Sequence, residues 1–139
     1  ERHDAVALVR RIPAREVRGV PWHLYRRVAF AILADADGDR DRAAALAREI
    51  RDDLTAAPAA ALVAIELIRR HVGKQAAAAL VRQLAPLPLA NYMRASLLVT
   101  SALINRSSGD YEAAHEVLER ALGVAAPAGM LQQAIAAGR

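Results

Sequence analysis

Apolar residues recur every three or four positions along most of the chain, and short segments rich in Gly, Pro, Asp or Ser interrupt them. This spacing puts apolar side chains on one side of an α-helix and is typical of amphipathic helices. No stretch shows the strict alternation of apolar and polar residues that predicts a strand. The pattern predicts helices over residues 4–12, 21–36, 40–54, 55–72, 74–85, 88–106, 110–122 and 127–137.

Proline, aspartate and glycine mark the boundaries of these helices. Proline is favoured in the first turn of a helix, and an aspartate just before a helix caps its free N–H groups. Glycine ends helices because it adopts left-handed backbone conformations without strain. The predicted starts lie at Pro21, Asp39, Pro58, Pro88 and Pro127, and the predicted ends include Gly73 and Gly123.

The composition supports an all-α fold. Hydrophobic residues make up 55% of the 139 positions, and alanine alone supplies 34 of them, whereas aromatic residues reach only 4%. Alanine has the highest helix propensity, while branched and aromatic residues favour strands. This composition argues against a β-sandwich or a β-barrel. It also predicts close helix packing, because each alanine buries little apolar area.

The breaks between helices recur at a fixed period. Gly38, Gly73 and Gly109 lie 35 and 36 residues apart, and each separates two predicted helices. A helix–turn–helix unit of about 34 residues is the period of tetratricopeptide arrays, whose hairpins stack to bury their apolar faces. We therefore predict one domain over 1–139, a right-handed α–α superhelix of about three hairpins. The units cover about 22–54, 56–86 and 88–123, with short flanking helices at 4–12 and 127–137.

The third unit carries the most specific sign of this repeat. Residues 109–114 read GDYEAA, and Ala121 follows Ala114 by seven positions. This segment resembles the second-helix signature of a tetratricopeptide repeat, in which small residues allow close helix contact. Ala31 and Ala102 fall where that family places a small residue in the first helix, but Glu66 stands there in the middle unit. The family's tryptophan is missing from all three units, so these repeats depart from the consensus.

In a tetratricopeptide-like stack, the first helix of each hairpin lines the concave face. With the three glycines as register marks, this face carries Tyr25, Val28, Ile32 and Asp35, then Val63, Leu67, Arg70 and His71, then Ser96, Val99, Thr100, Leu103 and Arg106. The set forms an apolar strip bordered by Arg70 and Arg106. Two interpretations stay open: a groove for a small apolar ligand or an amphipathic partner helix, and residues of the inter-helix core.

A narrower resemblance covers residues 95–138. Residues 118–131 read LERALGVAAPAGML, and Gly138 follows. The segment is similar to the end of the helical-repeat region in large LuxR-type transcriptional regulators of the maltose-regulator class. In that family an ATPase module precedes the helical-repeat sensor and a helix-turn-helix domain follows it. The chain carries neither a phosphate loop nor a DNA-reading helix and begins at Glu1, so the resemblance implies a fragment of a longer regulator.

Cysteine and histidine give no sign of a catalytic or zinc site. The chain has no cysteine, which removes disulfides, thiol catalysis and cysteine–zinc sites. The four histidines are His3, His23, His71 and His115, and no two lie three or four residues apart. The Glu-x-x-His spacing occurs once, at Glu112 and His115, whereas a di-iron bundle needs two copies.

Other chemical motifs are equally weak. Asp35, Asp37, Asp39 and Asp41 alternate as in a calcium loop, but that loop needs Gly at its sixth position and Glu at its twelfth. Arg and Leu stand at those positions. No nucleophile elbow, phosphate loop or dinucleotide fingerprint is present. We therefore expect no enzymatic activity, no cofactor and no metal.

The charge is concentrated near the start of the chain. The formal net charge of +4 lies wholly within residues 1–30, because residues 31–139 hold equal numbers of basic and acidic residues. A nucleic-acid footprint would be spread along a groove or helix, so we expect no direct nucleic-acid binding. No run of about 20 apolar residues predicts a membrane span. Without a signal peptide or cysteine, the sequence favours the cytoplasm.

These observations favour a non-catalytic regulatory function. We expect a ligand- or protein-binding sensor domain of a bacterial transcriptional regulator. Arg70 and Arg106 would be its polar contacts, and Ile32, Leu67 and Leu103 its apolar contacts. A ligand or partner that prefers one curvature of the stack would bias the neighbouring modules. The alternative is a stand-alone adaptor or scaffold that binds proteins or self-associates as a homo-oligomer, because an incomplete solenoid leaves apolar ends uncovered.

Overall fold

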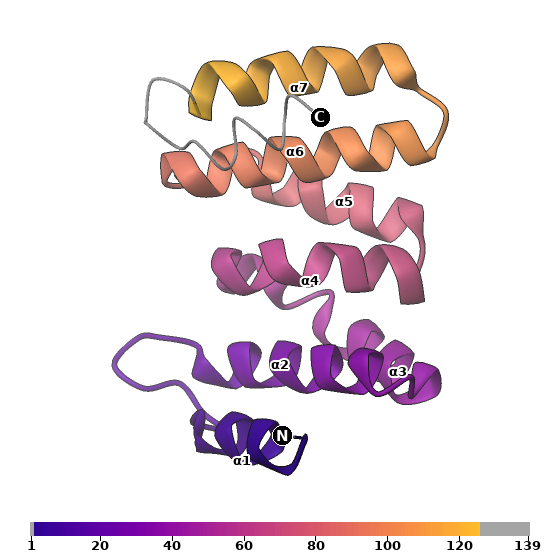
Figure 1. Cartoon of the computed structure of the whole chain (residues 1–139). Coiled ribbons are helices and arrows are strands. Elements are labelled where there is room, and N and C mark those ends of the chain that lie inside the picture. The colour runs from indigo at the N-terminus through magenta and orange to yellow at the C-terminus, as the bar shows by residue number, and fades with distance from the viewer. Residues whose placement is uncertain (1, 126–139) are drawn as a thin grey trace. The chain divides into compact units, whose positions relative to one another are not determined.

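The computed structural model describes residues 2–125 of the chain, and the regular elements in this range are helical (Figure 1). They are α1 (Arg2–Arg11), α2 (Trp22–Ala36), α3 (Arg40–Ile50), the single 3-10 turn η1 (Leu54–Ala56), α4 (Pro58–His71), α5 (Lys74–Leu84), α6 (Asn91–Ser107) and α7 (Tyr111–Ala125). The predicted all-α class is confirmed for this range. The predicted helix over 127–137 lies outside the described residues.

The chain divides into two compact units whose border falls inside α5. The first unit ends at Leu80 and the second begins at Val81. Alanine, leucine and isoleucine dominate the buried side chains, and within the described range no polar or charged residue is fully buried. The apolar stripes read from the sequence therefore account for the core of each unit.

The first unit is built around α2, α3 and α4. Helix α2 packs against α3 and α4, α3 also packs against α4, and α1 lies against α2. Ala31, Ala43 and Ala47 are fully buried, and such small side chains allow close helix contact. Ile65 and Ile68 of α4 are also fully buried and supply the larger apolar volume.

The second unit is a long hairpin of α6 and α7, which run side by side (Figure 1). Ala102, Ala114 and Ala121 are buried, as the repeat pattern predicts for small residues at helix contacts. The guanidinium of Arg94 donates to the backbone oxygens of Ala85 at 3.2 Å and Leu87 at 2.9 Å. These bonds attach the proline-rich segment before α6 to the first turn of that helix.

The turns of the first and third predicted units have the same construction. Gly38 and Gly109 have positive φ angles of 76° and 83°, in the region that favours glycine. The Oδ1 atoms of Asp39 and Asp110 each accept a backbone N–H three residues ahead, at 3.1 Å. The predicted cap at Asp39 is therefore confirmed, and Asp110 caps α7 in the same way.

The middle turn departs from this construction. Gly73 has a φ of 139°, which is positive but far from the left-handed helical value of about 57°, so the predicted left-handed cap is wrong. Instead, the N–H groups of Val72 and Gly73 both donate to the Ile68 oxygen, at 2.8 and 2.9 Å. Lys74 stands where the other turns carry the capping aspartate.

Two predicted boundaries around α3 and α6 are also wrong. Helix α3 ends at Ile50, not near Leu54, because acidic residues at 52 and 53 oppose the negative end of the helix dipole. Helix α6 begins at Asn91 rather than at Pro88, because the backbone of Ala90 is extended, with φ −59° and ψ 151°. After Ile50 the chain turns and then forms the separate 3-10 turn η1, so the α-helix does not reach Leu54.

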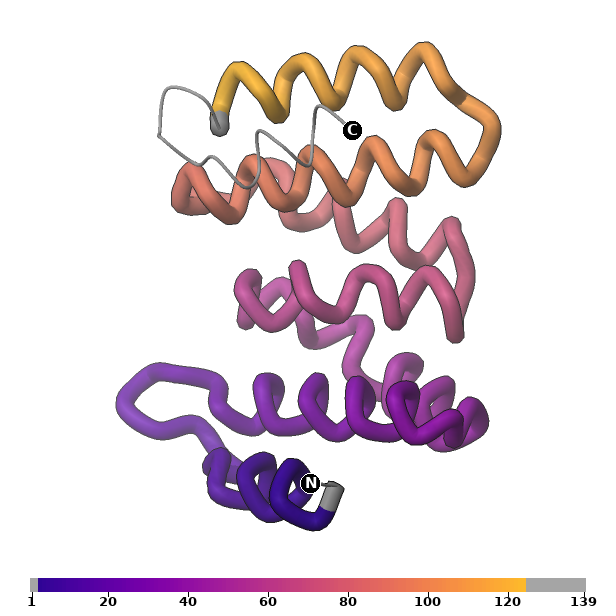
Figure 2. Tube along the Cα trace, viewed as in Figure 1, coloured from indigo at the N-terminus to yellow at the C-terminus, as the bar shows by residue number. Residues whose placement is uncertain are grey.

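Two further boundaries differ from the prediction. Helix α7 continues through Gly123 to Ala125, because a single glycine costs only about 1 kcal/mol in a helix and the flanking Leu122 and Val124 are half-buried. Pro21 is the residue before α2 rather than part of its first turn. Between α1 and α2 the chain forms a loop (Figure 2) whose isolated bridge joins Val17 and Val20.

The aspartate caps give a direct stability prediction. Asp39→Ala should lower the free energy of unfolding by about 1 kcal/mol, because the N–H of Arg42 loses its acceptor. Asp39→Asn should stay near wild type, because asparagine also caps helices. Urea unfolding followed by circular dichroism measures both. Glu116→Ala, at an exposed position on α7, is the control, and an equal loss in Asp39→Asn would contradict this explanation.

Candidate functional site

Asp35 brings together two of the residues predicted on α4. Its Oδ2 atom lies 2.5 Å from Nη1 of Arg70, and its Oδ1 atom lies 2.7 Å from Nε2 of His71. The three residues come from the last turns of α2 and α4, which pack against each other. Their separations of 35 and 36 residues equal the spacing of the glycine breaks. The contact joins the ends of two helices that the sequence pattern places one period apart, and it lies within the first unit.

The electrostatics of this cluster favour the ionised carboxylate of Asp35. The hydrogen bond from His71 lowers the pKa of Asp35 most, burial opposes this, and Arg70 lowers the pKa further. The side chains of Asp35 and His71 are 21% and 7% exposed, whereas that of Arg70 is 51% exposed. His71 is therefore an interior group, and Arg70 is the accessible cation of the cluster.

Sequence reasoning missed two members of this network. Nε and Nη2 of Arg69 donate to the two carboxylate oxygens of Glu66, at 2.7 and 2.6 Å, and Nη2 of Arg70 lies 3.6 Å from Glu66 Oε1. Arg69 is the largest cause of the lowered pKa of Glu66, and Glu66 raises the pKa of Arg69. The i,i+3 and i,i+4 spacings along α4 were the available signal. Glu66 is exposed, so α4 does not use this position for close helix contact.

The apolar residues predicted on α2 and α4 divide into two groups. Ile32 and Val63 are 38% and 59% exposed, and Tyr25 is half-buried. Val28 and Leu67 are buried at 3% and 6%, so for these two the inter-helix core interpretation holds. A 35-residue spacing aligns the sequence of two helices, but their neighbours differ. Helix α1 lies against α2, whereas η1 lies against α4.

The residues predicted on α6 belong to the second unit. Ser96, Val99 and Thr100 are half-buried, and the Thr100 hydroxyl donates to the Ser96 oxygen at 2.9 Å within the helix. Leu103 is 56% exposed and Arg106 is exposed. The accessible part of this set is therefore one apolar and one cationic side chain near the end of α6.

Two properties of the described range concern metal binding and membrane insertion. Across residues 2–125, no three His, Asp or Glu side chains gather where they could hold a metal ion. In the same part of the chain, no helix has the length and apolar character needed to cross a membrane. The arrangement at α2 and α4 offers an exposed guanidinium, an ionised carboxylate and exposed aliphatic side chains, which suits binding.

Comparisons with known proteins assign no family. No protein-family model matches the chain, and no curated protein or solved structure matches it either. A function for the chain therefore has to be argued from the geometry of the described residues and from the sequence pattern.

Proposed function

We propose that the chain is a tetratricopeptide-like helical-repeat domain that works by binding, as the sensor of a bacterial LuxR-type transcriptional regulator. One observation carries this proposal. Asp35 of α2 binds Arg70 and His71 of α4, one repeat length away, and the exposed Ile32 and Val63 lie on the same two helices. Consecutive first helices of a repeat would present such a face together. The resemblance of residues 95–138 to the end of a regulator's repeat region supports the biological setting.

The binding mode follows from the exposure of these side chains. Ile32 and Val63 would contact the apolar part of a ligand or of an amphipathic partner helix, and Arg70 would contact an anionic group. Arg70 already binds Asp35, so an incoming carboxylate would compete for the bond that joins α2 to α4. A ligand that binds one arrangement of these helices better would shift the population toward it. In a cytoplasmic regulator, this shift would reach the neighbouring modules.

The proposal is tested by substituting the exposed apolar residues of α2 and α4 through mutations in the host's chromosomal gene. Ile32→Asp combined with Val63→Asp should change the same transcripts as deletion of the gene, because two charges would occupy the apolar contact surface. Ala45→Asp, an exposed position on α3, is the matched control and should leave the transcripts unchanged. RNA sequencing measures the transcripts, and immunoblotting checks protein levels. A deletion that changes transcripts while the face variant does not would contradict the assigned face. A deletion without effect would contradict the regulator proposal.

The second candidate is a stand-alone adaptor or scaffold that self-associates. The exposed apolar side chains Leu8, Tyr92 and Tyr111, at 61%, 55% and 69% exposure, favour it. Light scattering over a concentration series distinguishes the candidates. A mass that rises with concentration supports self-association, and a constant monomer mass contradicts it.

A further inference from the structure

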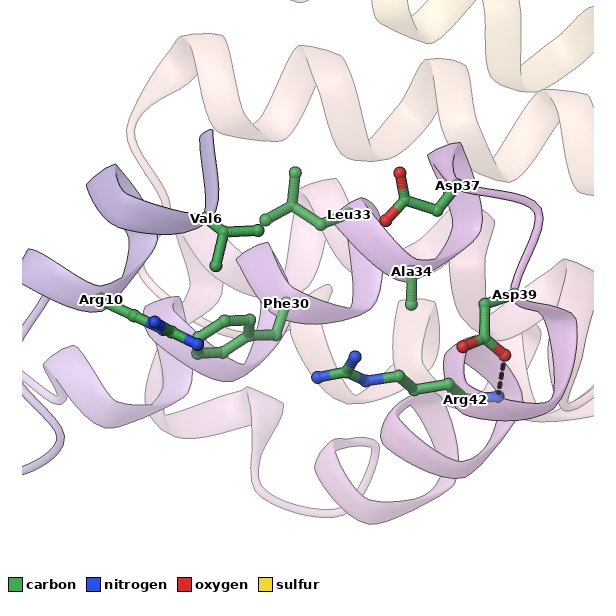
Figure 3. Close-up of a pocket in the computed structure, with 8 residues that line it drawn as sticks. All are labelled: Val6, Arg10, Phe30, Leu33, Ala34, Asp37, Asp39 and Arg42. Carbon is green, nitrogen blue, oxygen red and sulfur yellow. Dashed lines mark hydrogen bonds between the residues drawn. The ribbon is translucent and has the colours of Figure 1, made fainter. Parts of the chain in front are cut away.

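A cavity of about 230 Å³ lies where α1, α2 and the start of α3 meet (Figure 3). Its apolar wall includes Val6 of α1 and Phe30 and Leu33 of α2. Arg10 of α1 and Arg42 of α3 enter the same cavity, and in Figure 3 both side chains extend toward Phe30. All of these residues belong to the first unit, so one compact body builds the whole cavity.

The cations of this cavity are available, whereas its carboxylates are engaged. Among the described residues, no hydrogen bond or ion pair joins the guanidinium of Arg10 or Arg42 to another group. Asp39 accepts the backbone N–H of Arg42 as a helix cap, and Asp37 takes part in an interaction of its own. The cavity is therefore lined by two guanidinium groups and two carboxylates, and only the guanidinium groups can donate hydrogen bonds to an anionic ligand.

A third arginine adds to the positive charge near this wall. The guanidinium carbon of Arg26 lies 5.6 Å from the centroid of the Phe30 ring, and its buried Nε atom has no hydrogen-bond partner. The cavity also lies beside the N-terminal end of α3, where the helix dipole favours negative charge. Arg10 and Arg26 belong to the arginine-rich residues 1–30, so part of the positive charge of that segment lies at this cavity.

We propose that this cavity binds a small organic carboxylate with an apolar body. The carboxylate would accept charge-assisted hydrogen bonds from Arg10 and Arg42, and the apolar body would lie against Phe30 and Leu33. Successive helical residues turn by about 100°, so Phe30, Leu33 and Ala34 share the side of α2 opposite Ile32 and Asp35. This site is therefore separate from the face on α2 and α4, and it does not rest on the function proposed for that face.

Calorimetric titration of the whole chain with octanoate tests the proposal. Octanol carries the apolar body without the charge, and inorganic phosphate carries the charge without the body. Octanoate should bind at least about tenfold more tightly than either, because both parts of the site contribute. No octanoate binding, or octanol or phosphate binding as tightly as octanoate, would overturn the proposal.

Variants assign the binding to this cavity. Arg10→Ala combined with Arg42→Ala should weaken octanoate binding at least about tenfold. Arg48→Ala, which changes an exposed arginine on α3 that does not line the cavity, is the matched control and should bind like wild type. Asp39→Asn keeps a capping side chain and removes a negative charge from the cavity, so it should tighten binding. Wild-type affinity in the double arginine variant, or weaker binding in Asp39→Asn, would contradict the assignment.

Discussion

Ile68→Ala should lower the free energy of unfolding by about 2–5 kcal/mol, the range for removing a buried aliphatic side chain from a packed core. Ile68 is fully buried on α4, the helix that packs against both α2 and α3. The loss combines the missing transfer free energy with a cavity that the surrounding helices fill only in part. Urea unfolding followed by far-ultraviolet circular dichroism measures the change.

The control for this prediction lies on the same helix. Val63 is 59% exposed, so Val63→Ala should change the free energy of unfolding by no more than about 0.5 kcal/mol. A small effect in both variants would show that α4 does not pack through the face containing Ile68. A large effect in Val63→Ala would show that the proposed binding face is instead covered.

Asp35→Ala should lower the free energy of unfolding at neutral pH by about 1–3 kcal/mol, the cost of an unsatisfied buried polar group. The His71 side chain is 7% exposed and its Nε2 atom lies 2.7 Å from Asp35 Oδ1, so the variant leaves this ring nitrogen without that acceptor in the interior. Arg70 contributes less because half of its side chain is exposed and water can solvate it. Glu66→Gln, which removes a more exposed carboxylate, should cost clearly less.

The pH dependence of the Asp35→Ala effect has a definite sign. Hydrogen bonds from His71 and Arg70 lower the pKa of Asp35 in the folded chain. The stabilisation is therefore fully present above the unfolded-state pKa of about 3.9, and it is lost as the pH falls through the lowered pKa. The stability difference between wild type and Asp35→Ala should therefore shrink as the pH falls below 4. A difference that stays at its pH 5 value down to about pH 2 would contradict the role given to Asp35.

The elements of the fold could be predicted from the sequence because their signals are local. The apolar periodicity identified each described helix, and the Gly-Asp pairs at Gly38 and Gly109 identified two turns with their caps. Two helix ends differ from the prediction, because α3 stops at Ile50 and α7 continues past Gly123. Each of these ends depends on competition between local signals and the packing of the whole helix. A capping residue or a glycine alone does not decide that competition.

The candidate site was predicted in part for a different reason. The repeat spacing brought Asp35, Arg70 and His71 together, because equivalent helix ends lie side by side in α2 and α4. The same spacing could not distinguish the exposed Val63 from the buried Leu67, which lie about 40° apart around α4. Which of two such neighbours is covered depends on adjoining helices. The cavity at Phe30 likewise required three segments whose contact no local pattern encodes.

The repeat architecture is the claim on which the proposed function rests, and distances between spin labels test it most directly. The chain has no cysteine, so Arg48→Cys, Gln83→Cys and Glu119→Cys can be labelled in pairs; all three positions are exposed and lie one repeat apart on α3, α5 and α7. A regular stack moves each equivalent residue by the same step. A regular stack should therefore give narrow distance distributions with closely similar means for the 48–83 and 83–119 pairs. Broad distributions, or two clearly different means, would contradict it.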